Sequence, residues 1–127
     1  MSESNHTDML ELKSVGEVWI VSFKQASIGG IGGIEKIAET LRELVQNHTH
    51  CKMVVDFSNV CFFSSQMLGL LVDIWRRMKD EGGTLLISGI NPQMTRVFRI
   101  THLDKLFNFY ENTDAALATL HTTESQS

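Results

Sequence analysis

The stretch from Met53 to Met78 constrains the fold most, because it joins an apolar strand to an amphipathic helix. The strand is a short apolar run that ends at Asp56, as strands inside a sheet do. The helix carries apolar residues at helical spacing on one face, which comprises Met67, Leu68, Leu71, Ile74, Trp75 and Met78. A buried strand that leads into a helix favours an α/β fold, with Trp75 packed against the sheet.

Ser64 and Ser65 stand where this helix should begin. Serine is a favoured cap because its side-chain oxygen accepts a hydrogen bond from an unpaired backbone N–H of the first turn. The same position lies at the positive end of the helix dipole, which favours a negative charge. Two explanations therefore stay open: the serines only cap the helix, or one of them carries a regulated phosphate.

Two apolar segments before this stretch predict a β-hairpin. Leu10–Val15 and Glu17–Phe23 both suit strands, and Gly16 provides the turn. Strands joined so tightly must be antiparallel. A helix follows, and its predicted buried face contains Ile34, Ile37, Ala38, Leu41, Leu44 and Val45.

The chain after the central helix predicts two further strands and two helices. A glycine pair ends the central helix, and Thr84–Ser88 is the next strand. Asn91 caps a short helix that begins with proline. The inward face of this short helix is predicted to contain Met94, Val97, Phe98 and His102. Phe107–Tyr110 is a last strand before a final helix that ends near Leu120.

These elements predict one α/β domain with a mixed, mostly parallel sheet of four to five strands and about four helices. We place the domain at residues 9–121, between disordered polar tails at residues 1–8 and 122–127. A chain of 127 residues with 43% hydrophobic residues can bury a single core without disulfides or metals.

Composition excludes several functional classes. A net charge of −4 gives no electrostatic footprint for nucleic acid. No apolar run reaches the length of a membrane span, and no signal peptide precedes the first strand. Cys51 and Cys61 flank an extended strand and lie too far apart to form a disulfide with each other. We therefore expect free thiols in a reduced, cytoplasmic protein.

The sequence also argues against catalysis and against a metal or cofactor. Ser65 lacks the flanking glycines of a hydrolase nucleophile elbow, so we predict no catalytic residue. His48, His50 and Cys51 lack a fourth ligand at suitable spacing, so we predict no metal site. The glycine-rich segment Ser27–Ile34 matches no phosphate-binding motif and is predicted to be a surface loop.

The motif from Asp56 to Ser65, followed by Leu68 and Gly69, resembles the signature of the STAS domain family. This family comprises domains of sulfate transporters and anti-sigma factor antagonists. The glycine pair before Thr84, the Asn91-Pro92 pair and the segment Leu103–Phe107 are similar to the family's C-terminal half. The resemblance extends from about Leu10 to Leu120 and implies a stand-alone STAS domain.

The resemblance implies a function as a bacterial anti-sigma factor antagonist. Such proteins bind an anti-sigma factor that is often a serine kinase, and the kinase breaks the complex by phosphorylating one serine. A serine phosphatase reverses the modification. By alignment this serine is Ser65, with Ser64 as the alternative because Ser64 replaces the family's aspartate. The predicted partner-binding residues are Ile28, Gly29, Gly30, Phe63, Ser64, Ser65, Gln66 and Met67.

A second class of function stays open beside the first. STAS domains also serve as scaffolds or accessory subunits, for example in transport systems, without a phosphorylation switch. The glycine-rich loop keeps a small-ligand or nucleotide-binding module as a further alternative. In both cases we expect no direct insertion into a membrane.

Overall fold

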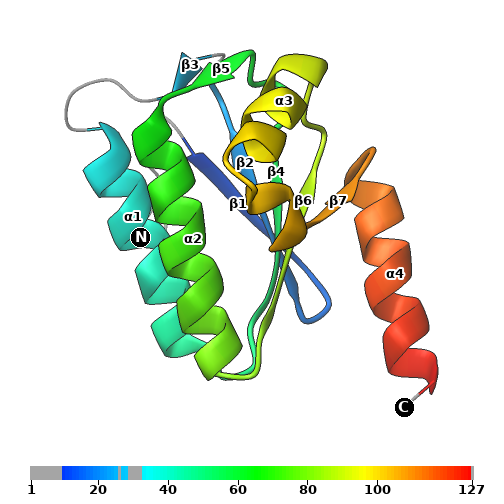
Figure 1. The fold of residues 1–127 in the computed structure, drawn as a ribbon. Coiled ribbons are helices and arrows are strands. Elements are labelled where there is room, and N and C mark those ends of the chain that lie inside the picture. Colours follow the sequence, from blue (N-terminus) through cyan, green and yellow to red (C-terminus); the bar gives the residue numbers. More distant parts are fainter. Residues whose placement is uncertain (1–9, 26, 29–32, 127) are drawn as a thin grey trace.

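The computed structural model describes residues 10–25, 27–28 and 33–126, and within this part it forms an α/β domain with a mixed five-stranded sheet (Figure 1). The strand order is β1-β2-β4-β6-β7. The strands are β1 (Leu10–Val15), β2 (Val18–Phe23), β4 (Lys52–Asp56), β6 (Thr84–Ser88) and β7 (Asn108–Tyr110). Only β1 and β2 pair antiparallel in this sheet, and the other neighbours are parallel. The predicted fold class is confirmed.

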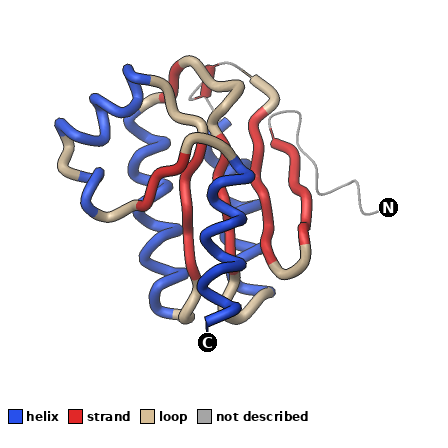
Figure 2. The backbone as a smooth tube through the Cα atoms, turned by 90° about the vertical axis from the view of Figure 1, so that its right-hand side faces the viewer, coloured by secondary structure: helices blue, strands red, loops and turns tan. Residues whose placement is uncertain are grey.

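Helices cover both faces of the sheet unequally. They are α1 (Gly33–Asn47), α2 (Ser65–Asp80), α3 (Pro92–Ile100) and α4 (Thr113–Gln126), with a 3₁₀ turn, η2, at Leu103–Lys105. Buried residues of α1, α2 and α3 share the larger apolar core with one face of the sheet. Helix α4 packs alone on the opposite face, where Figure 2 shows it in front of the strands. The larger core therefore lies on the side that carries the serine-bearing helix.

A second, two-stranded sheet was not predicted. β3 (Ser27–Ile28) pairs in parallel with β5 (Phe62–Phe63), so part of the predicted surface loop is a strand. This pairing joins two segments far apart in the chain, and side-chain periodicity in a two-residue strand is too short to read from sequence. It fixes the approach of the chain to α2, because the N–H of Ser64 donates to the Ile28 carbonyl at 2.9 Å.

The predicted buried faces are confirmed for α1 and α2, with Trp75 half-buried against Phe107 at a ring distance of 6.4 Å. The face of α3 is corrected: Met94 and Phe98 are buried, but Val97 is 38% exposed. His102 is also exposed and has a left-handed backbone, with φ of 64°. The sequence pattern misassigned Val97 because α3 is short and only one side of it contacts the core.

The final helix is longer than the sequence predicts. Helix α4 continues to Gln126, beyond the end that the sequence predicts near Leu120. Its N-terminus is capped by Asn112, whose Oδ1 accepts from the Ala115 N–H at 2.8 Å. The predicted boundary at residue 9 lies outside the described residues.

Candidate functional site at the start of helix α2

The candidate site lies at the carboxyl edge of the parallel strands. β4 leads through Phe57–Phe63 to the start of α2, and β6 leads to the start of α3 at the same end of the molecule (Figure 1). Loops that follow adjacent parallel strands meet at this edge, which is where α/β proteins usually place binding sites. The fold therefore puts the two serines at the edge of the sheet where binding sites of α/β proteins usually lie.

The two serines have different environments. Ser64 is the N-cap of α2, with φ −83° and ψ 167°, and its carbonyl accepts from the Met67 N–H at 3.0 Å. Its hydroxyl makes no capping hydrogen bond, and Ser64 Oγ is buried without a partner among the described residues. Ser65 is the first helical residue, and it is exposed. Of the two serines, only Ser65 is exposed, whereas the hydroxyl oxygen of Ser64 is buried.

Contacts between aromatic rings in the core position the segment that leads into α2. Phe57 stacks on Phe23 at a centroid distance of 5.2 Å, and Phe63 meets Phe57 at 5.4 Å. Phe63 also contacts Phe98 of α3 edge to face at 5.8 Å. Because Phe63 immediately precedes the serines, this packing fixes where α2 begins relative to α3.

Three of the predicted partner-binding side chains are not at the surface. Ile28 is 3% exposed, Phe63 is 6% exposed and Met67 is fully buried. For Phe63, the alternation of side chains along β5 explains the burial, because Phe63 points into the core while Phe62 points outward. Gln66 is exposed beside Ser65. Gly29 and Gly30 lie outside the described residues.

Phe62 is the functional candidate that the sequence reasoning missed. It is 61% exposed, one of four large apolar side chains at the described surface. The sequence could indicate only that one of two consecutive strand residues is exposed, because they point to opposite faces, and it could not show which one. The exposed surface next to Ser65 therefore contains Phe62 and Gln66 rather than Phe63 and Met67.

A hydrogen-bonded cluster fixes the ends of β4 and β6 beside the site. Asp56 Oδ1 accepts from Ser58 Oγ at 2.7 Å and from Ser88 Oγ at 2.9 Å. The next residue, Gly89, has φ of +74°, and its N–H donates to the Tyr110 carbonyl at 3.1 Å. The motif aspartate therefore joins two strands instead of facing a ligand.

The start of α3 is attached to the same edge. Asn91 Oδ1 accepts from the Met94 N–H at 2.8 Å, which confirms Asn91 as the cap. Asn91 Nδ2 donates to the Cys61 carbonyl at 3.2 Å. This second bond ties α3 to the segment that leads into β5 and α2.

The groups that could support other chemistry lie elsewhere. His48 and His50 follow α1 at the opposite end of the parallel strands, where they line a surface hollow of about 510 Å³ together with Cys51 and Trp19. Within the described residues no group of three or more histidine, cysteine or acidic side chains could hold a metal. Cys51 and Cys61 are free, and burial raises the pKa of the Cys51 thiol to about 11.

One charged cluster joins the two helices that flank the site. Asp73 Oδ2 accepts from Arg77 Nε at 3.1 Å and from Arg42 Nε of α1 at 3.2 Å. Burial raises the pKa of Asp73, but the hydrogen bonds and charges of Arg77 and Arg42 outweigh it and hold the pKa below its usual value. All three side chains are at least partly exposed, so the cluster adds little to stability. The cluster links α2 to α1 through Asp73 and Arg42.

Comparison with known proteins identifies the family. The STAS domain family matches residues 31–116. An anti-sigma-B factor antagonist of Staphylococcus epidermidis is 28% identical over 109 residues, which cover 86% of this chain and 90% of that protein. The chain belongs to the STAS domain family.

Solved structures agree with this assignment. An anti-sigma factor antagonist (STAS) domain protein from Planctomyces limnophilus is 25% identical with a TM-score of 0.78, covering 88% of this chain and 97% of that chain. An anti-sigma factor antagonist from Mycobacterium paratuberculosis has a TM-score of 0.77 and 22% identity over 88% of this chain and 92% of that chain, a likeness of fold alone. Among the residues that the structure describes, no helix is long and apolar enough to cross a membrane.

Proposed function

We propose that this protein is an anti-sigma factor antagonist, a cytoplasmic regulator without enzymatic activity that is switched by phosphorylation of Ser65. It docks on an anti-sigma factor with serine kinase activity through the surface at the start of α2. The observation that carries the proposal is the exposed Ser65 hydroxyl at the first position of α2, next to the outward-facing Phe62. The homology to anti-sigma factor antagonists supports the choice of partner.

The helix start suits a reversible phosphate. A phosphoserine adds about −1.5 to −2 charges at pH 7. Negative charge at an exposed helix N-terminus is favourable by about 0.3 to 1 kcal/mol, so the modification should not unfold the domain. A docked partner experiences the opposite effect, because a hydrated phosphate cannot be buried in an apolar contact. The switch therefore acts on the complex and leaves the fold intact.

The geometry favours Ser65 over Ser64 as the modified residue. A kinase must reach the hydroxyl, and Ser64 Oγ is buried whereas Ser65 is exposed. A phosphate on Ser64 would also have to be accommodated at a buried oxygen. We therefore keep Ser65 as the proposed site, with a serine phosphatase as the second partner that removes the phosphate.

The test measures binding of purified anti-sigma factors from the source organism to wild type, Ser65→Ala and Ser65→Asp. We expect Ser65→Asp to weaken binding at least tenfold, which corresponds to about 1.4 kcal/mol, with a nearly unchanged melting temperature. Ser65→Ala should bind like wild type and should no longer be phosphorylated by the kinase. Equal affinity of wild type and Ser65→Asp would reject the switch.

Ser64→Asp is the matched control for position. It places a charge where the serine oxygen is buried, so its melting temperature should fall. If Ser64→Asp stays folded and is the only variant that loses binding, the surface is correct and the assignment of Ser65 is wrong.

A further inference from the structure

The exposed apolar side chains of this protein gather near one helix. Four large apolar residues are exposed in the described structure, and they are Phe62, Val97, Ile100 and Leu106. Phe62 lies on β5, Val97 and Ile100 on α3, and Leu106 directly after η2. Scattered exposed residues need no explanation, but a concentration on neighbouring elements marks an interaction surface.

Helix α3 itself carries only positive charges, and the nearest acidic residue along the chain is Asp104 of η2. The chain contains 15 acidic residues, yet none of them falls within residues 57–72 or 88–103. The only full charges in these two segments are Arg96 and Arg99, and both are exposed on α3. A protein with a net charge of −4 therefore presents a locally cationic and apolar face. We call Phe62, Arg96, Val97, Arg99 and Ile100 the α3 face.

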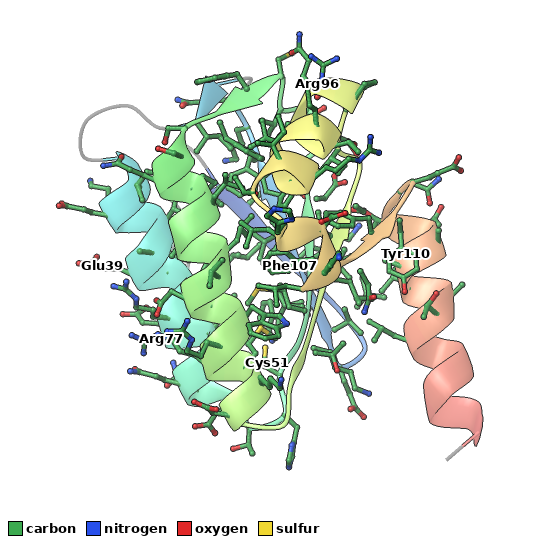
Figure 3. The ribbon with its side chains drawn as sticks, in the orientation of Figure 1. Glu39, Cys51, Arg77, Arg96, Phe107 and Tyr110 are labelled. Carbon is green, nitrogen blue, oxygen red and sulfur yellow. The ribbon has the colours of Figure 1, made fainter. Side chains whose placement is uncertain are left out.

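Helix α3, which carries most of the α3 face, is fixed to the segment that leads into α2. Asn91 Nδ2 binds the Cys61 carbonyl at 3.2 Å, and Phe98 meets Phe63 at 5.8 Å, so α3 and β5 are fixed together. Figure 3 shows Arg96 projecting outward from α3 at the end of the molecule where β5 leads into α2. Arg96 and Ile100 are four residues apart and thus lie on one side of the helix.

We propose that the α3 face is a second part of the docking surface and binds an apolar, acidic face of the anti-sigma factor. This inference rests on the proposed function, because it names the chemistry of the same partner. Phe62, Val97 and Ile100 contact apolar side chains of the partner, and Arg96 and Arg99 pair with its carboxylates. Arginine suits this role because its planar guanidinium binds carboxylates with two hydrogen bonds.

The charge of the partner then explains how phosphorylation acts. An acidic face set against Arg96 and Arg99 is repelled by a phosphate on Ser65 at the same end of the domain. Attraction between exposed opposite charges is screened by salt, so the association rate of the unmodified protein should fall as ionic strength rises.

A membrane surface is the competing occupant for a cationic, apolar helix. Recognition of anionic lipids by charge usually takes four to eight Lys or Arg residues in a cluster. The nine-residue α3 has two arginines and also lies in a chain of net negative charge. The observations therefore favour a protein partner.

The test compares two double charge reversals in the full chain. Arg96→Glu/Arg99→Glu inverts the α3 face, and Lys13→Glu/Arg76→Glu makes the same change in net charge at exposed residues outside it. Each variant, with wild type and Ser65→Asp, is titrated with the anti-sigma factors of the source organism at low and high salt. Ile100→Ser, at a side chain that is 68% exposed, tests the apolar part without a charge.

We expect Arg96→Glu/Arg99→Glu to weaken binding at least tenfold, Ile100→Ser at least threefold, and the control less than twofold, with unchanged melting temperatures. Equal affinity of the two double reversals, with binding lost in Ser65→Asp, overturns the α3 face and leaves the switch intact. Loss in Arg96→Glu/Arg99→Glu with normal binding of Ser65→Asp supports the α3 face and rejects the switch. Wild type is also tested with vesicles of phosphatidylcholine and phosphatidylglycerol. Both the α3 face and the switch are overturned if wild type binds no anti-sigma factor, or if it binds only to the vesicles.

Discussion

The starts of α2 and α3 lie at the same edge of the sheet but are built differently. At α3, Asn91 closes the first turn through Met94 at 2.8 Å and also bonds to Cys61. At α2, Ser64 contributes its backbone carbonyl, and its hydroxyl makes no capping bond. Both caps have extended backbones, so the contrast is in the side chains.

The start of α3 is therefore held by side-chain hydrogen bonds, whereas the start of α2, where we propose binding, is not. The start of α3 is fixed by side-chain hydrogen bonds and by the Asp56 cluster at the end of β6. The start of α2 is positioned by packing and by β3–β5 pairing, and the exposed Ser65, where we propose phosphorylation, lies at the positive end of the helix dipole. Three substitutions test the contrast.

Gly89→Ala should have the largest effect. An added Cβ would clash with Ser58 Oγ and would come within 2.8 Å of the Ser58 nitrogen, and φ of +74° disfavours any L side chain. We expect a loss of at least about 2 kcal/mol in the free energy of unfolding, measured by urea denaturation.

Gly69→Ala is the matched control, because its Cβ would meet nothing within 4 Å on the exposed side of α2. It should stabilise the domain by about 0.5 to 1 kcal/mol. Similar effects of the two changes would show that the junction before α3 is not tightly built.

Asn91→Ala should have an intermediate effect. It removes the cap of α3 and the bond to the Cys61 carbonyl, so we expect a loss of about 1 to 2 kcal/mol in unfolding free energy. Asn91→Asp keeps a capping oxygen and loses only the donor to Cys61, so it should be milder. An Asn91→Ala domain as stable as wild type would contradict the structural assignment of this junction.

Ser64→Ala should have the smallest effect. Its hydroxyl is buried without a partner in the described part of the chain, so truncation breaks no described hydrogen bond. We expect a change below about 0.5 kcal/mol in unfolding free energy, whereas a serine that caps a helix would cost about 1 kcal/mol. A loss as large as that of Asn91→Ala would erase the contrast between the two helix starts and show that Ser64 caps α2 in solution.

The sequence predicted which elements flank the candidate site, but it did not predict which side chains there are exposed. The strand ending at Asp56 and the helix after Ser64 follow from periodicity, and both are observed. Periodicity could not show that Phe63 is buried and Phe62 exposed, because that choice depends on pairing with β3 and packing on Phe98. Of this pair, the predicted partner-binding residue Phe63 is buried and its neighbour Phe62 is exposed.

By itself, the sequence determined the order of the four helices and of the strands of the five-stranded sheet, the buried faces of α1 and α2, the Asn91 cap and the serine pair at a helix start, because these depend on residues close in the chain. Tertiary structure alone decided which serine is exposed, that Asp56 joins β4 to β6 and that Val97 and Ile100 face solvent. Those outcomes depend on contacts between distant segments. Apolar spacing indicates the buried face of a long helix, but in short elements such as β5 and α3 burial depends on which distant segments pack around each residue.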